Sequence, residues 1–112
     1  MASGGQLLQI ANRMSSLHSE CFGRGPARAR AYQEDDFVFV VLEGCFIDAE
    51  QTLVRDRRDA DVREFRESFQ EVLRSQFIEI VEDVLGRRVL DYMSQALKRT
   101  DVVVEIFQLA DS

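Results

Sequence analysis

Apolar residues recur at three- and four-residue steps in two long stretches of the chain, which is the period of an amphipathic helix. The first stretch runs from about Gln6 to Phe22, and Gly23 after it is a suitable left-handed stop. The second runs from near Asp61, which has capping-box spacing to Glu64, to Leu85, and Gly86 ends it. Its apolar positions are Val62, Phe65, Phe69, Val72, Leu73, Phe77, Ile80, Val84 and Leu85.

Other segments have the composition of β-strands. A hairpin is expected from about Arg28 to Glu43, with a turn at 34–36 and the apolar run 37–42 as its second strand. Residues 87–97 and 102–109 predict a second hairpin. A short helix at 48–54, with Asp48 as N-cap, is expected between the hairpin and the second long helix.

This order of elements predicts one α+β domain over residues 1–112. We expect a two-layer sandwich in which the two long helices cover one face of a mainly antiparallel, four-stranded sheet. The last strand is apolar on both sides, with Val103, Glu105, Phe107 and Leu109 on one side and Val102, Val104 and Ile106 on the other. Such a strand at a sheet edge invites pairing, so we expect a homodimer formed by edge or face packing.

Composition excludes several kinds of chemistry. The 112 residues include one His, two Cys and no Trp, and Lys98 is the single Lys. Metal sites built on several His or Cys, Schiff-base chemistry and His–His acid–base pairs therefore have too few residues. We expect no enzyme, no cofactor and no metal. The net charge of -6 also disfavours binding to nucleic acid, which needs basic surface.

The cysteines and the hydropathy pattern point to an intracellular protein. Cys21 and Cys45 have no CxxC spacing and stand among apolar neighbours, so we expect both to be small buried hydrophobes. There is no basic leader, and no stretch approaches the roughly 18 apolar residues that a membrane helix needs. The expectation is a cytoplasmic protein without direct membrane insertion.

A local basic patch stands out in this acidic sequence. Arg24, Arg28 and Arg30 surround a Gly-Pro loop, and Arg28 and Arg30 share one side of the predicted strand. With the backbone of Gly25 and its neighbours they are candidate ligands for phosphate, carboxylate or bicarbonate. The alternative is a loop that bends the chain, with its arginines paired to nearby carboxylates such as Glu20, Glu34 or Asp35.

Two further groups of polar residues have structural explanations that we favour. His18 lies on the apolar stripe of the first helix, where a lone His is usually a hydrogen-bonded core residue rather than a general base. Two carboxylate clusters could bind a hard cation, but neither has an EF-hand pattern, so we expect caps and solvated faces. These clusters are Glu43, Asp48 and Glu50, and Glu79, Glu82 and Asp83.

Several short motifs occur in order along the chain. They are GRGPARARAY at 23–32, DD at 35–36, VVLEG at 40–44, AEQTLV at 49–54, VRE at 62–64, GRRV at 86–89 and MS at 93–94. Together they resemble a family of small bacterial domains named after MpsC, a proposed component of a sodium-translocating system that generates a membrane potential. The resemblance spans about Leu7 to Leu109. It implies an accessory protein and supplies no catalytic residues.

The sequence therefore favours a non-enzymatic accessory or protein-interaction domain, linked to ion transport through a protein partner such as a membrane transporter subunit. The rival function is a sensor of a small anion or ligand that uses the arginines of the loop.

Overall fold

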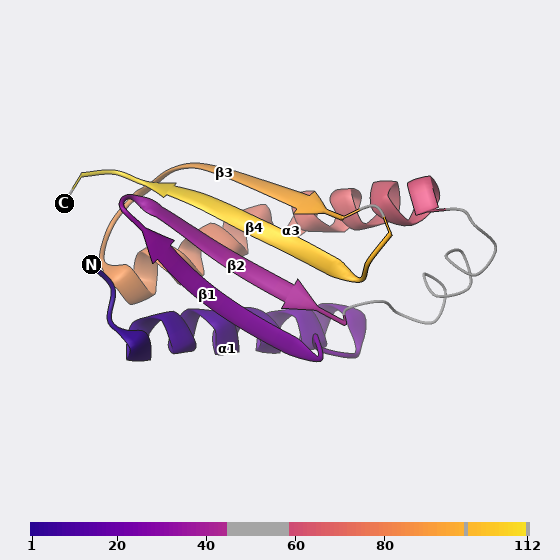
Figure 1. The fold of residues 1–112 in the computed structure, drawn as a ribbon, viewed down its shortest axis with the longest axis horizontal. Helices are drawn as coiled ribbons and strands as arrows, with labels where there is room; N and C mark the ends of the chain where they lie inside the picture. Colours follow the sequence, from indigo (N-terminus) through magenta and orange to yellow (C-terminus); the bar gives the residue numbers. More distant parts are fainter. Residues whose placement is uncertain (45–58, 98, 112) are drawn as a thin grey trace.

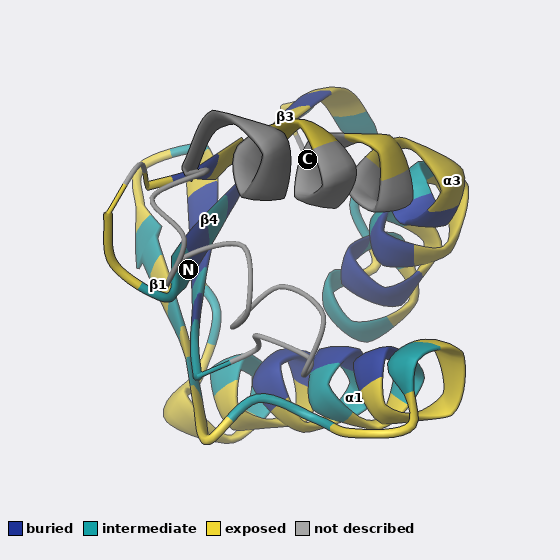
Figure 2. Ribbon diagram, turned by 90° about the vertical axis from the view of Figure 1, so that its right-hand side faces the viewer, coloured by how far each residue is buried: buried dark blue, intermediate teal, exposed yellow. Residues whose placement is uncertain are grey.

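The computed structural model describes residues 1–44, 59–97 and 99–111. The elements follow the order α1 (Gly4–Phe22), β1 (Arg28–Glu34), β2 (Phe37–Glu43), α3 (Asp59–Leu85), β3 (Val89–Ala96) and β4 (Val102–Leu109) (Figure 1). All strand pairs are antiparallel, in the order β1-β2-β4-β3. Both helices lie on one side of the sheet (Figure 2). The predicted α+β sandwich is therefore confirmed.

The core forms where the two helices meet the sheet. Alternation of side chains along each strand sends every second residue toward the helices, while α1 packs against β1 and α3 packs against β3. The buried apolar residues are Ile10 and Met14 of α1, Leu73, Phe77, Ile80 and Val81 of α3, Val38, Val40 and Leu42 of β2, Tyr92 and Ala96 of β3, and Val103, Phe107 and Leu109 of β4.

Local signals in the sequence explain the ends of α1. The Ser3 side chain accepts a hydrogen bond from the backbone of Gln6, and the Gln6 side chain accepts one from the backbone of Ser3. This capping box starts the helix two residues before the predicted position. At the other end, Gly23 adopts a φ of 76° and donates its N–H to Ser19 O at 2.8 Å, as expected for a left-handed stop.

Three expectations from the helical patterns are wrong. Cys21 is exposed, because it lies beside the covered side of α1, to which His18 and Phe22 belong. Val72 is also on the solvent side of α3, with 74% of its surface exposed. The second helix begins at Asp59, so Asp61 lies inside its first turn and is not the N-cap. The short helix predicted at 48–54, and Cys45, lie outside the described residues.

The position of β4 corrects the expected edge pairing. The last strand is hydrogen-bonded to β2 on one side and to β3 on the other, so it has no free edge. Its two apolar sides are those of an inner strand, and the edge strands are β1 and β3. Pairing through the edge of β4 is therefore excluded. Val102, Val104 and Ile106 of β4 lie on the side of the sheet away from the core.

Candidate functional site

The sheet face opposite the helices, called the open face below, is the candidate functional surface. The residues between the core positions of each strand form it, since successive side chains point to opposite sides. It consists of Arg28, Arg30, Tyr32 and Glu34 of β1, Phe37, Phe39, Val41 and Glu43 of β2, Val102, Val104, Ile106 and Gln108 of β4, and Asp91, Met93 and Gln95 of β3.

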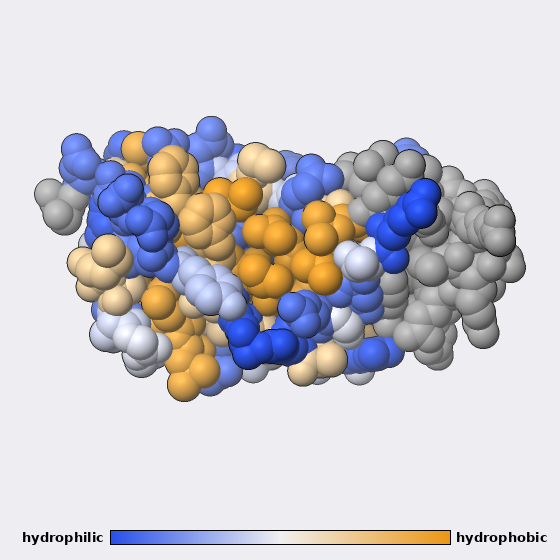
Figure 3. Space-filling view, viewed as in Figure 1, coloured by the Kyte–Doolittle hydropathy of each residue, from blue (hydrophilic) through white to orange (hydrophobic). Residues whose placement is uncertain are grey.

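Apolar side chains gather in the middle of the open face, and Figure 3 shows this patch over the strands. The strand register aligns Tyr32, Phe39, Ile106 and Met93 in one row across all four strands, beside a second row of Arg30, Val41, Val104 and Gln95. Tyr32 is 47% exposed and Met93 is 53% exposed. Rings of Phe37 and Phe39 lie with their centroids 6.4 Å apart along β2. The signal for this face in the sequence is the unbroken apolar run 37–42.

The open face is too flat for a small-molecule site. It contains a shallow hollow of about 150 Å³, whereas pockets for drug-sized ligands usually measure at least about 300 Å³. A broad apolar surface with charges near its margins is the arrangement found at protein interfaces. The hollow is lined by Phe37, Asp91, Tyr92, Met93, Ile106 and Gln108.

The structure separates the three arginines of the predicted anion site. Arg28 and Arg30 are exposed and lie on the open face at the start of β1, where Glu43 is the cross-strand neighbour of Arg28. Arg24 lies in the loop before β1 and donates from Nη2 to the carbonyl oxygen of Gly44 at 3.4 Å. Two of the three guanidinium groups thus share a face, and the third contacts the end of β2.

The Gly-Pro loop itself is held tightly against α1. The imidazole Nδ1 of His18 lies 3.2 Å from the carbonyl oxygen of Arg24, and because a carbonyl oxygen only accepts, this bond needs a proton on Nδ1. A Cβ on Gly25 would lie 3.2 Å from Ser15 O, so a glycine allows the close approach. His18 is 3% exposed and packs on the ring of Phe22, which confirms the expectation of a hydrogen-bonded core histidine.

A buried carboxylic acid was not singled out by the sequence. Glu105 on β4 is fully buried, and Oε2 accepts a hydrogen bond of 2.5 Å from the Tyr92 hydroxyl. Oε1 has no hydrogen-bond partner among the described residues. Burial raises the pKa of Glu105 to about 7, although the hydroxyls of Tyr92 and Ser94 favour the carboxylate. The sequence signal that could have identified this buried acid is the position of Glu105 among apolar residues on the core-facing side of the last strand.

Burial and the neighbouring Glu105 also raise the pKa of Tyr92 well above its usual range. The guanidinium of Arg74 lies over the Tyr92 ring, 5.2 Å from its centroid. The phenol is therefore a neutral donor at any ordinary pH, and the pair can exchange only the one proton of Glu105 with solvent.

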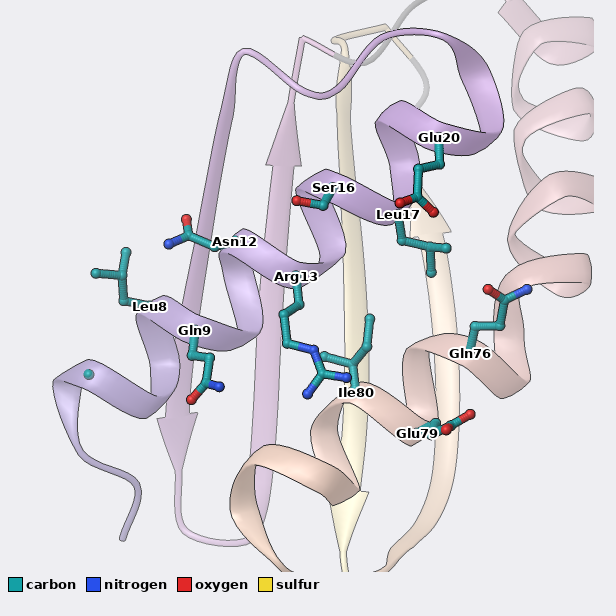
Figure 4. A pocket seen from close by; sticks show the side chains of 11 residues that line it. Leu8, Gln9, Asn12, Arg13, Ser16, Leu17, Glu20, Gln76, Glu79 and Ile80 are labelled. Carbon is teal, nitrogen blue, oxygen red and sulfur yellow. The ribbon is translucent and has the colours of Figure 1, made fainter.

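A groove of about 660 Å³ lies between α1 and α3, and Figure 4 shows the polar side chains that line most of it. Arg13 of α1 forms an ion pair of 2.7 Å with Asp83 of α3 near this groove. Glu82 accepts a hydrogen bond from the backbone N–H of Val89 at 2.8 Å. Two of the three carboxylates in the second predicted cation cluster thus have partners of their own.

Within the described parts of the chain, no group of three or more potential ligands could hold a metal ion. In the first predicted cluster, Asp48 and Glu50 lie outside the described residues. None of the described helices is long and apolar enough to span a bilayer.

Fold and surface together define an α+β domain with a core on one side of its sheet and an apolar patch on the other. The model of the family described as Na+-translocating membrane potential-generating system (MpsC) matches residues 5–111. The chain therefore belongs to this family, as the resemblance of its motifs predicts. Neither the curated proteins nor the solved structures contain a significant match.

Proposed function

We propose that this chain is a non-enzymatic, cytosolic accessory component of the Na+-translocating membrane potential-generating system, and that it works as a homodimer paired through the open face. The observation that supports this most directly is the row of Tyr32, Phe39, Ile106 and Met93 across the open face. Exposed apolar patches with a polar rim often mark protein–protein interaction sites. Burial of this row between two copies removes it from water.

The match to the family supports a link with ion transport. Any such role proceeds through a membrane-bound protein partner, which would bind a surface that the dimer leaves accessible. Several polar side chains of the described residues have structural partners: His18 holds the loop, and Arg13 and Glu82 hold α3. This structural use of polar side chains favours an interaction domain over an enzyme.

Replacement of Ile106 by Lys is expected to convert the dimer into a monomer, since it places a charge in the middle of the open face. The matched control is Val72→Lys, which changes a β-branched apolar residue that is 74% exposed on α3. Both variants reduce the net negative charge equally, so repulsion between acidic chains does not distinguish them. Light scattering after size exclusion, over a range of micromolar concentrations, measures the mass.

A monomeric wild type, or an Ile106→Lys variant as dimeric as Val72→Lys, would contradict the proposed function. Circular dichroism and thermal melting verify that both variants are folded. Because Ile106 points away from the core, we expect its replacement to lower stability by about 1 kcal/mol at most beyond that of the control.

Phosphate and small carboxylates provide the test of the rival function, an anion sensor that uses Arg24, Arg28, Arg30 and Gly25. A ligand that binds the native state raises the melting temperature. We expect no specific rise in millimolar phosphate, because the loop is already held by its own hydrogen bonds. A rise in wild type that disappears in Arg28→Ala but not in Arg88→Ala, an exposed arginine before β3 at the opposite end of the sheet, would instead support the sensor.

A further inference from the structure

The open face carries opposite charges at the two ends of β1. Arg28 and Arg30 lie at its start and Glu34 at its end, all on the same side of the strand and all exposed. A strand with this pattern is complementary to a reversed copy of itself. This feature permits a choice between the two aligned arrangements in which two identical sheets can pack face to face.

A two-fold axis parallel to the strands would place β1 of one copy over β3 of the other. The register aligns Glu34 with Phe37, Gln108 and Asp91 across the sheet. Glu34 would therefore lie opposite Asp91 of the partner copy, and the symmetry would repeat this contact between like charges. Such juxtapositions disfavour an interface.

A two-fold axis perpendicular to the strands instead places each strand over its own copy with the direction reversed. One position for this axis is above the aligned row of Ala31, Val40, Glu105 and Ser94. In that position it would place Arg28 opposite Glu34 of the partner copy. Arg30 would then face Tyr32 of the partner copy, an arrangement suited to a cation–π contact.

The same operation keeps the apolar residues together. Phe39 would face Val41 of the partner copy, and Val104 would face Ile106 of the partner copy. Both pairs lie in the two middle rows of the open face. Arg28 and Glu34 therefore meet as opposite charges at the β1 rim while apolar side chains meet at the centre, which is the usual anatomy of an interface. At the ends of β2, Glu43 would face Phe37 of the partner copy.

We propose that two copies pack through their open faces about a two-fold axis perpendicular to the strands, with Arg28 of each copy paired to Glu34 of the other. This inference rests on the proposed function and adds the geometry of the interface and the residues that set it. Four strands about 4.8 Å apart and seven residues of about 3.3 Å each give a projected area on the order of 400 Å² per copy. An interface of this size is small, and buried area does not set affinity, so the dissociation constant has to be measured directly.

A charge-swap series measured by sedimentation equilibrium tests this pairing. Glu34→Arg and Arg28→Glu each create two like-charge contacts, because the two-fold axis repeats them, and each raises the dissociation constant about tenfold. The double variant R28E/E34R restores the opposite charges and returns the constant to within about threefold of wild type. Asp91→Asn is the control, and it leaves the dissociation constant unchanged.

The outcomes separate this inference from the proposed function. If Ile106→Lys abolishes the dimer but R28E/E34R fails to recover from the single variants, the geometry is wrong and pairing through the open face stands. A tighter dimer in Asp91→Asn would indicate the axis parallel to the strands. If Ile106→Lys leaves the dimer intact while the charge swap behaves as stated, two β1 edges pair side by side, and both the proposed interface and this inference fail.

Discussion

From about pH 5 to about pH 8, the stability of Glu105→Gln is expected to increase relative to wild type by about 3 kcal/mol. The carboxyl of Glu105 is fully buried, and its pKa is raised from 4.5 to about 7. Between these values the native chain holds a proton that the unfolded chain has released. Wild-type stability therefore falls as pH rises through this window, and it becomes level again above the native pKa.

Glutamine removes this pH dependence of the free energy of unfolding, because its side chain cannot ionise. The two chains differ only at this residue, so the difference between the two free energies of unfolding isolates Glu105. Urea unfolding at several pH values measures it. A difference that stays constant across the window would show that Glu105 titrates as an ordinary surface carboxyl.

Tyr92→Phe provides a second measurement on the same pair. The Tyr92 hydroxyl donates to Oε2 of Glu105 and so favours the carboxylate. Its removal is expected to raise the pKa of Glu105 further and to extend the pH-dependent region to higher pH. The ring of Tyr92 packs 5.0 Å from the ring of Phe107, and phenylalanine keeps that contact.

Gly44→Ala is expected to lower the free energy of unfolding by about 2–5 kcal/mol. Gly44 ends β2 with a φ of 74°, and a Cβ there would lie 2.6 Å from the Cβ of Ala27 and 3.2 Å from its backbone nitrogen. The left-handed conformation costs a non-glycine residue about 1–2 kcal/mol, and overpacking adds about 1–3 kcal/mol. The backbone N–H of Gly44 also bonds to Asp101 O at 2.9 Å, so displacement would disturb a second connection.

Gly86→Ala is the matched control for this change. Gly86 has a φ of 65°, but a Cβ there would meet no atom within 4 Å. Gly86→Ala is therefore expected to lower the free energy of unfolding only by the cost of the left-handed conformation, about 1–2 kcal/mol. Chemical denaturation compares the two variants, and equal losses would contradict the steric part of the argument. Addition of Ala27→Gly to Gly44→Ala should recover part of the loss, because it removes the nearest atom.

Much of the fold follows from local patterns in the sequence. Both long helices and all four strands lie within a few residues of their expected positions, because hydrophobic period, caps and turn residues act over short distances. The errors at Cys21 and Val72 arise at the margin of an apolar stripe, since the next residue in each helix, Phe22 or Leu73, packs on the core. A helical pattern shows which residues share a side, but it does not show how wide a strip of that side is covered.

Strand order could not be predicted in the same way. The position of β4 between β2 and β3 depends on pairing between residues far apart in the chain, such as Phe37 and Gln108. The sequence showed that both sides of β4 are apolar. The structure explains this, because β4 is an inner strand with one side in the core and the other side on the open face. The sequence showed only the β4 part of the candidate surface, Val102, Val104 and Ile106, because its rows exist only after four separate strands are aligned.

The inner position of β4 also has a consequence for how the chain acquires its structure. Synthesis on the ribosome produces β1, β2 and β3 before β4, so the first hairpin and the third strand each wait with an unsatisfied backbone edge. The sheet closes only when the last strand inserts between them, and such long-range pairings are the slow steps of folding. During that interval the apolar segments of β2 and β3 are accessible to chaperones and to other nascent chains.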